Sequence, residues 1–293
     1  MELRHLRYFT VLAEELHFGR AARRLHLSQP PLSFNIKQLE ATLGVQLLER
    51  NSHGVKLTPA GETFRRSALQ VLADVDTAAL RTRDVAAGVT ARVRIGFVGS
   101  MLFRGLPERL ESFHAQHAGV QVELTELNSA EQVEAIARGQ IDLGFVHTQR
   151  VPAGLRCERY MSEPFMACVP AGHPASDAAV WDAAHWRQMP LVLFSRGASP
   201  DYYERVLGLC TQLGLDPLVR HEVRHWLSVV ALVAKGMGMA LVPRALMDSG
   251  VAGVRFLPLP ETGVRSEVHL LWNERQMPAV LPALVAHFLE GAG

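Results

Sequence analysis

The sequence contains little cysteine, and the cysteines it has do not form a recognisable site. Cys157, Cys168 and Cys210 are the only ones in 293 residues, and no C-x-x-C pair occurs. Their spacing gives neither a zinc framework nor a disulfide framework. We therefore expect buried thiols in a reducing cytoplasm, with a redox-sensing pair as the alternative.

The sequence also lacks a long apolar segment and a large charge of either sign. No run approaches the 18 or more apolar residues of a membrane span, and charges occupy the N-terminal region where a signal peptide would be apolar. The net charge is +3 over residues 1–87 and −2 over the remainder. That small excess has the sign expected of a nucleic-acid-binding N-terminus. The length and the 48% hydrophobic content allow a sizeable core and two or three domains.

The first 87 residues have the apolar spacing of helices. Three- and four-residue steps place Leu3, Leu6, Phe9, Ala13 and Leu16 on one face. A short helix follows over residues 20–25. A third helix is predicted from Ser28, with two prolines in its first turn, to about residue 43, where a glycine ends it. Residues 49–58 predict a β-hairpin, or wing.

A long helix is predicted to begin after Thr58 and to end at Gly88. Its apolar residues alternate four- and three-residue steps, and they are Phe64, Ala68, Val71, Val75, Ala78, Thr82 and Val85. A single seam of this kind on an otherwise polar helix is typical of a coiled coil and predicts a partner helix. Packing of the seam on its own domain is the alternative.

Beyond Gly88 the pattern changes to alternating strands and helices. The first set comprises strands at 92–99, 120–127 and 141–146 with helices at 107–117 and 130–138. The second comprises strands near 165–169, 191–194, 218–223 and 239–242, helices at 201–213 and 227–235, and a closing strand and helix at 268–272 and 278–289. The βαβαβ order predicts a parallel sheet covered on both faces. Two α/β lobes with a cleft between them form a natural small-molecule site.

The order helix, tight turn, helix and wing is typical of a DNA-binding domain. The outer side of the third helix presents Gln29, Pro30, Ser33, Phe34 and Lys37. Glutamine can hydrogen-bond adenine edges, serine a base or a phosphate, and lysine a guanine or a phosphate. In the wing, Arg50, His53 and Lys56 are placed to reach the DNA backbone or a minor groove. A helical bundle with a solvated polar face is the alternative.

The segment "MELRHLRYFTVLAEELHFGRAARRLHLSQPPLSFNIKQLEATLGVQLLERNSHGVKLTPAG" resembles the DNA-binding domain of LysR-type transcriptional regulators. Further along, "GQIDLGFV", "GHP" and "LVAKGMGMALVP" are similar to segments of the same family. The resemblance implies a winged helix-turn-helix over 1–60, a linker and dimerisation helix over 61–88, and an effector-binding domain over 89–293 like a periplasmic binding protein. Lobe I would cover about 89–163 and 266–293, and lobe II about 164–265.

The resemblance also implies the partners. They would be double-stranded promoter DNA, a small-molecule effector and further copies of the chain as a dimer of dimers, with RNA polymerase as a further candidate and no cofactor or membrane. The N-terminal sequence is most similar to that of regulators of aromatic-compound catabolism, which implies an aromatic or dicarboxylate effector. Two positions depart from the family, which often has a polar residue or arginine at Phe34 and an arginine at His53.

By the same resemblance, the effector cleft would be lined by side chains that follow strands or begin helices. They are Ser100, Ser129, His147, Ser195, Arg196, Tyr202 and Trp226. The serines precede helices, where a hydroxyl and nearby N–H groups could hold a carboxylate. Arg196 could pair with an anion. A bulky Trp226 would narrow the pocket, which predicts a small or flat ligand.

The stretch "HEVRH", residues 221–225, fits the zinc motif H-E-x-x-H. In that motif the two histidines share one face of a helix. Here His221 lies in a predicted strand and His225 in the turn after it, so their side chains do not share a face. We therefore predict no metal site and no catalysis. A zinc peptidase is the disfavoured alternative, and a solute-binding protein with an unrelated N-terminal bundle is a third hypothesis.

Overall fold

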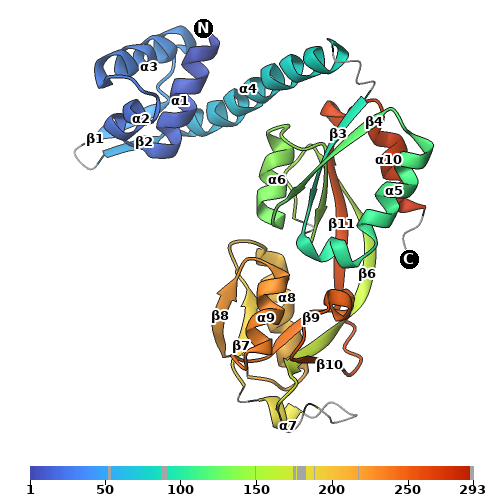
Figure 1. Cartoon of the computed structure of the whole chain (residues 1–293). Helices are drawn as coiled ribbons and strands as arrows, with labels where there is room; N and C mark the ends of the chain where they lie inside the picture. Colours follow the sequence, from blue (N-terminus) through green and yellow to red (C-terminus); the bar gives the residue numbers. More distant parts are fainter. Residues whose placement is uncertain are drawn as a thin grey trace. The chain divides into compact units, whose positions relative to one another are not determined.

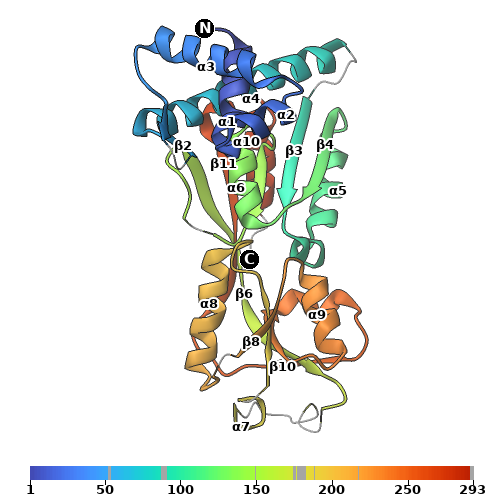
Figure 2. The ribbon, with the colours of Figure 1, turned by 90° about the vertical axis from the view of Figure 1, so that its left-hand side faces the viewer.

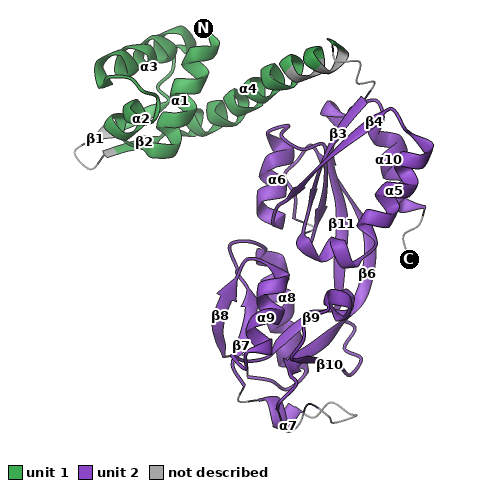
Figure 3. Cartoon of the chain, viewed as in Figure 1, with its two compact units in different colours: residues 1–87 green, residues 88–293 purple. Residues whose placement is uncertain are grey.

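The structure is a computed structural model that describes residues 1–51, 54–86, 91–148, 150–173, 176, 183–187, 189–216 and 218–290. Its contacts divide the chain into two compact units, residues 1–87 and 88–293 (Figure 3). Within the described ranges, no helix combines the length and the apolar character that crossing a bilayer requires.

Unit 1 is a helical domain followed by a hairpin and a long helix (Figure 1). Its elements are α1 (Leu3–Glu15), α2 (Phe18–Arg24), α3 (Gln29–Leu43), β1 (Leu48–Asn51), β2 (Gly54–Leu57) and α4 (Pro59–Ala86). The predicted apolar faces of α1 and α3 form the core, where Phe9, Leu32 and Ile36 are fully buried. Leu3 and Leu16 do not join it, because they lie at the two ends of the α1 segment and are exposed.

The carboxylate of Glu40 on the third helix binds the backbone at the start of the wing. Ser28 occupies the predicted N-cap position of α3, although its hydroxyl caps no described N–H group, and Gly44 ends the helix with φ of 69°. Glu40 Oε1 accepts hydrogen bonds from the backbone N–H groups of Leu47, at 2.8 Å, and Leu48, at 3.1 Å. The hairpin therefore starts from a fixed point on α3.

The apolar seam of α4 divides into a covered part and an exposed part. Thr58 Oγ1 caps the helix by accepting from Gly61 N at 2.9 Å. Phe64 packs edge-on against Phe9 of α1 at 5.2 Å between ring centroids, and Ala68 is buried. Val71, by contrast, is 43% exposed within unit 1. The start of the seam therefore packs on its own domain, and the next apolar position is free for a partner.

Unit 2 consists of two lobes that share one long strand, β6 (Leu155–Pro170) (Figure 1). Lobe I contains β3 (Ala91–Phe97), η1 (Gly99–Phe103), α5 (Leu106–Gln116), β4 (Val120–Glu126), α6 (Ser129–Ala137), β5 (Leu143–Val146), β11 (Arg265–Asn273), η3 (Glu274–Gln276) and α10 (Leu281–Leu289). Lobe II contains α7 (Ala183–Trp186), β7 (Leu191–Phe194), α8 (Pro200–Gln212), β8 (Val219–Val223), α9 (Trp226–Ala234), β9 (Ala240–Pro243), η2 (Arg244–Ser249) and β10 (Val254–Pro258).

The strand order confirms the parallel βαβαβ unit and corrects the second set. Strands β4, β3 and β5 are parallel neighbours, and β11 joins β5 antiparallel. The prediction of a separate strand near 165–169 was wrong, because that segment is the second part of β6, which begins at Leu155. The first part of β6 pairs with β11 and the second part with β9 and β10. Strand β10 was not predicted. The sheet thus continues from one lobe into the other.

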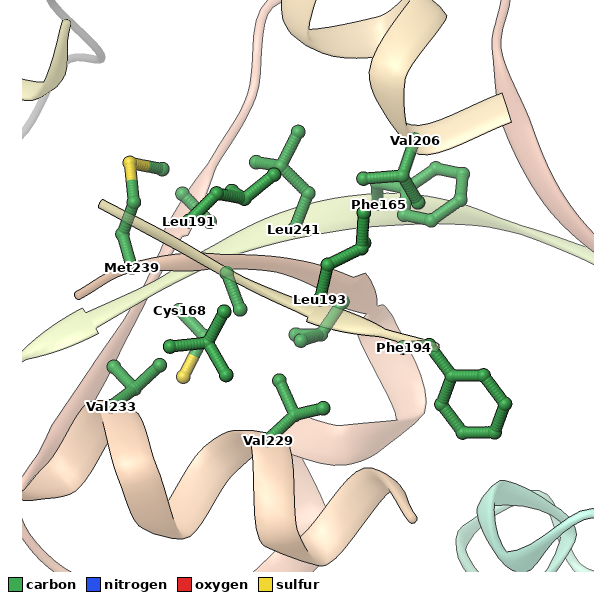
Figure 4. Packing of buried hydrophobic residues seen from close by; sticks show 14 of the residues in the cluster. Phe165, Cys168, Leu191, Leu193, Phe194, Val206, Val229, Val233, Met239 and Leu241 are labelled. Carbon is green, nitrogen blue, oxygen red and sulfur yellow. The ribbon is translucent and has the colours of Figure 1, made fainter. Parts of the chain in front are cut away.

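The core of lobe II lies on both sides of its strands. Figure 2 shows α8 and α9 on opposite sides of the lobe. Figure 4 shows Val206 of α8 on one side of the strands and Val229 and Val233 of α9 on the other, all three fully buried. Strand β7 is buried along its whole length between these helices, which is why it is apolar at every position.

The predicted path of the "HEVRH" stretch, a strand followed by a turn into a helix, is confirmed. His221 lies on β8 and His225 is the N-cap residue of α9, with extended backbone angles. The two side chains therefore do not share a helical face. Among the described residues, no group of three or more His, Cys, Asp or Glu could hold a metal ion.

Two glycines on helices should respond to alanine in opposite directions. A Cβ at Gly61 would lie 2.1 Å from the carbonyl oxygen of Leu47, whereas a Cβ at Gly208 on α8 meets nothing within 4 Å. We expect Gly61→Ala to lower the free energy of unfolding by about 1–3 kcal/mol through overpacking. Gly208→Ala should raise it by about 0.5–1 kcal/mol, because it restricts the unfolded chain. Urea unfolding of both variants tests this, and a stabilised Gly61→Ala would contradict it.

Candidate DNA-binding surface and effector site

The outer face of α3 presents the side chains predicted to contact DNA. Gln29, Pro30 and Lys37 are exposed and Ser33 is half-buried. Phe34 is 68% exposed, so this aromatic ring has no packing role within unit 1. An exposed apolar ring between polar side chains that can hydrogen-bond bases suits contact with a thymine methyl group.

The wing is described only in part. Lys56 of β2 is exposed, at the position paired with Glu49 of β1. The side chain of Arg50 and the whole of His53 lie outside the described residues. Their predicted contacts with DNA therefore stay predictions.

Five of the seven predicted effector residues lie together where the two lobes meet. Lobe I contributes Ser100 on η1, Ser129 at the start of α6 and His147 after β5, and lobe II contributes Tyr202 on α8 and Trp226 at the start of α9. All five are at most 4% exposed. The His147 ring centroid lies 4.6 Å from that of Tyr202 and 6.4 Å from that of Trp226.

His147 is fixed by hydrogen bonds in a single tautomer. Its backbone N–H donates to Ser129 Oγ at 3.0 Å, and its Nδ1 lies 2.8 Å from the carbonyl oxygen of Glu267. Since a carbonyl oxygen only accepts, Nδ1 must carry the proton. Nε2 of the neutral ring then accepts from the Ser100 hydroxyl, 3.5 Å away. The imidazole is therefore held in one orientation by groups from its own lobe.

Burial and a neighbouring cation determine the charge of this cluster. Burial lowers the pKa of His147 well below 6.5, and the positive charge of Arg104 lowers it further. Burial also raises the pKa of Tyr202 above its ordinary value. Both side chains are therefore uncharged at neutral pH, and neither can pair with an anionic ligand.

A buried ion pair that was not predicted, between Arg104 and Glu163, lies next to the cluster. The Arg104 side chain is 1% exposed and its Nη2 lies 2.5 Å from Glu163 Oε1. Arg104 also donates to Ser100 Oγ at 2.8 Å and to Ser266 Oγ at 3.1 Å. On the other side, Glu163 Oε2 accepts from Ala245 N at 2.8 Å. Because η1 and β11 belong to lobe I and η2 to lobe II, this pair connects both lobes at the β6 crossing.

Ser195 and Arg196 do not join the buried cluster. Ser195 is half-buried after β7, and its backbone N–H donates to the carbonyl oxygen of Val223 at 2.8 Å. The Arg196 side chain is 67% exposed, pairs with Glu204 of its own lobe, and lies 5.6 Å from the centre of the Tyr203 ring. Their roles in binding an effector stay predictions.

A small pocket opens at the edge of the cluster, between the lobes. Its lining residues come from both lobes and are Val98, Gly99, Glu126, Leu127, Asn128, Phe194, Arg224, His225 and Trp226. It leaves about 10 Å³ for the centres of water molecules, which is room for about one. This pocket as it stands is too small for a ligand larger than water.

Some of the residues that were not predicted have a signal in the sequence. Arg104 interrupts the apolar stretch "SMLFRGLP", where a charge needs a buried partner. Its partner Glu163 is 59 positions away, so no local pattern could find it. Arg224 belongs to the "HEVRH" stretch, but the zinc-motif pattern gives a role only to its histidines and glutamate.

The lowered pKa of His147 predicts a pH dependence of stability. The unfolded chain binds a proton on this histidine near pH 6.5, whereas the folded chain does not until the pH is much lower. The free energy of unfolding should therefore fall as pH decreases below about 6.5, by up to about 1.4 kcal/mol per pH unit for one proton. His147→Gln should reduce this slope between pH 6.5 and 5, as measured by urea unfolding. The exposed His114→Gln serves as control, and an unchanged slope in His147→Gln would contradict the assignment.

Two family models match the chain and together cover nearly all of it. Residues 3–62 match a bacterial regulatory helix-turn-helix protein of the lysR family, and residues 86–293 match a LysR substrate binding domain. The first match ends soon after α4 begins, and the second begins where the two units divide.

Curated relatives and solved structures agree with the models. The chain is 36% identical to the uncharacterised HTH-type transcriptional regulator YnfL of Escherichia coli K12 over 282 residues, 95% of both chains. It is 34% identical to BenM of Acinetobacter baylyi, covering 92% of this chain and 89% of BenM.

Solved structures include the LysR family regulator CbnR, with a TM-score of 0.70, 29% identity and complete coverage of both chains. Full-length CbnR is also known in complex with its target DNA, with a TM-score of 0.60 and the same identity and coverage. The BenM effector binding domain with its effector benzoate has a TM-score of 0.59 and 25% identity, and covers 69% of this chain and 92% of that one. With its helix-turn-helix domain and its two-lobed effector domain, the chain belongs to the LysR family of DNA-binding transcriptional regulators, and it is a regulator rather than an enzyme.

Proposed function

We propose that this regulator contacts promoter DNA through α3 and the wing and responds to a small, flat organic acid bound between the lobes of unit 2. The observation that carries the proposal is the cluster at the lobe junction. There, two serines, a neutral histidine and two aromatic rings from both lobes lie within contact distance of one another. A site built from two lobes changes when the lobes move, and this is what a sensor requires.

The DNA contacts follow from the exposed face of α3. Gln29, Pro30, Ser33, Phe34 and Lys37 would face the major groove, with Phe34 against a thymine methyl group. The wing, with Arg50 and His53, would reach the backbone or a minor groove. The known complex of full-length CbnR with its target DNA supports this role for the N-terminal domain.

The chemistry of the cleft favours an aromatic or otherwise flat ligand. Trp226 lies 5.3 Å from both Phe194 and Tyr202 between ring centroids, so three rings line one side of the junction. Ser100 and Ser129 of lobe I supply hydroxyl groups to the same junction. The effector benzoate of the BenM effector binding domain supports a ligand of this size and shape.

The effector would act by favouring one of two arrangements of the lobes. A ligand shifts such an equilibrium only by its difference in affinity for the two states. The small pocket admits about one water, so a ligand of benzoate size would favour a more open arrangement. The change in the effector domain would then alter the geometry of the assembly on DNA.

The assembly would be a homo-oligomer, a dimer of dimers, in the cytoplasm. The exposed seam of α4 supports a partner helix, because Val71 is 43% exposed on an amphipathic helix. RNA polymerase is a natural further partner for a regulator bound beside a promoter. Further copies of the chain would place several α3 helices on successive turns of the DNA.

Two α3 variants test the DNA-binding face. Lys37→Ala should weaken binding to every sequence and reduce the dependence of log K on log salt by about one unit if Lys37 contacts a phosphate. Phe34→Ala should instead weaken binding to the cognate site alone, by about 1–3 kcal/mol. Fluorescence anisotropy on the upstream region of the gene, at several salt concentrations, measures both. The exposed Lys235→Ala of unit 2 is the control.

If the wild-type chain shows no salt-dependent binding to any DNA, the proposal is contradicted and the solute-binding hypothesis is favoured. Equal affinity of Phe34→Ala and the wild type for the cognate site would remove Phe34 from the recognition surface.

The α4 seam predicts a change in assembly on substitution. Val71→Asp should break a helix-to-helix interface, because it buries an unpaired carboxylate there, and should lower the oligomer mass in sedimentation velocity. Ala79→Asp, which adds the same charge to an exposed position beside the seam, should leave the mass unchanged. A wild-type mass for Val71→Asp would show that α4 does not form the interface.

A further inference from the structure

The edge of the lobe junction carries polar side-chain contacts that cross from one lobe to the other. Arg224, which follows β8 of lobe II, pairs with Glu131 on α6 of lobe I. Beside it, His225 Nδ1 lies 3.5 Å from Oε1 of Glu126, at the end of β4. Arg224, His225 and Glu126 all line the small pocket. Arg224 and His225 belong to lobe II and the two carboxylates to lobe I.

Glu131 is held in place whether or not it pairs with Arg224. Its Oε2 accepts a hydrogen bond from Asn128 N at 3.0 Å, and Asn128 Oδ1 accepts from Glu131 N at 3.0 Å. This reciprocal capping box involves only the N-terminal end of α6 and no residue of lobe II. The other carboxylate oxygen, Oε1, is the one that meets Arg224. Loss of Arg224 would therefore leave Glu131 capped and α6 intact.

The Arg224–Glu131 pair is also easy to exchange. The two side chains are 60% and 42% exposed. Ion pairs of such exposure shift equilibria by only about fivefold or less, because water and salt screen them. A ligand carboxylate that binds Arg224 and also buries an apolar body would therefore outcompete Glu131.

Lobe II presents further groups suited to an anionic ligand at the same place. The nine-residue helix α9 begins at Trp226, and among the described residues no side chain caps its N-terminus. Such a terminus favours a negative charge. Trp226 is 4% exposed, and its indole Nε1 has no hydrogen-bond partner within the described chain. A buried donor of this kind, on a residue that lines the pocket, points to an acceptor supplied by a ligand.

We propose that Arg224 receives the acidic group of the effector, and that Glu131 occupies Arg224 until the effector arrives. The ligand class is a small monocarboxylate whose flat apolar part lies against Phe194 and Trp226, with an oxygen that accepts from the Trp226 indole. Binding exchanges one carboxylate on Arg224 for another, and it thereby releases a contact between the lobes. The inference rests on the proposed function of the lobe junction as the effector site.

Titration calorimetry of the full-length chain with benzoate, and with benzamide as an uncharged probe of the same shape, tests the exchange. Glu131→Gln removes the internal competitor and should bind benzoate about two- to fivefold more tightly than the wild type. Arg224→Gln should lose at least tenfold in benzoate affinity. Benzamide should bind the wild type, Glu131→Gln and Arg224→Gln with equal affinity.

Matched controls come from a second exposed pair on the same helix, Glu134 with Arg138, 3.2 Å apart. Glu134→Gln and Arg138→Gln change the charge as the test variants do, away from the pocket residues, and should bind benzoate like the wild type. Wild-type affinity in Arg224→Gln would overturn the proposal. So would a Glu131→Gln variant that binds benzoate no better than Glu134→Gln does, or not at all.

Trp226→Ala separates this proposal from the proposed function. If Trp226→Ala abolishes benzoate binding while Arg224→Gln retains it, the lobe junction is the effector site and only the role of Arg224 is wrong. If benzoate binds and neither variant affects it, the ligand lies elsewhere and both proposals fail.

Discussion

The buried ion pair between Arg104 and Glu163 is the interaction on which the lobe junction depends. Burying a guanidinium is costly unless a counter-charge and hydrogen-bond acceptors surround it. Here Glu163, Ser100 and Ser266 provide them, and Glu163 also accepts from the backbone of η2. The pair thereby fixes η1, β6, β11 and η2 relative to one another at the point where the chain crosses between lobes. Removing either partner would leave an uncompensated charge at this crossing.

That constraint also explains the distribution of charge in the candidate effector site. Arg104 is already surrounded by acceptors, and burial together with the charge of Arg104 lowers the pKa of the adjacent His147 and keeps it neutral. The interior of the site is therefore polar and aromatic without a free charge in its described part. Charged groups able to exchange partners lie at the edge, where Arg224 meets Glu131. A ligand with a flat body and one acidic group matches this division between interior and edge.

Much of the fold could be predicted from the sequence, because helix and strand periodicity are local. The core of α3 and the parallel βαβαβ unit follow from spacing alone, and the path of "HEVRH" follows from alternation and a turn. The features that could not be predicted depend on contacts between residues far apart in the sequence. The continuation of β6 through both lobes depends on pairing with β11, β9 and β10, which are far away in the sequence. The partner of Arg104 was hidden for the same reason, whereas Ser100, Ser129 and His147 follow strands and could be placed by topology.

In the proposed function, a small acid bound between the lobes changes how the protein holds DNA. The most direct measurement combines footprinting and DNA bending by the full-length chain on its own upstream region. The acid that most stabilises the chain in a thermal-shift screen of aromatic acids and dicarboxylates would be added. We expect this acid to change the extent of the footprint and the bend angle. An identical footprint and bend with and without the acid would contradict it.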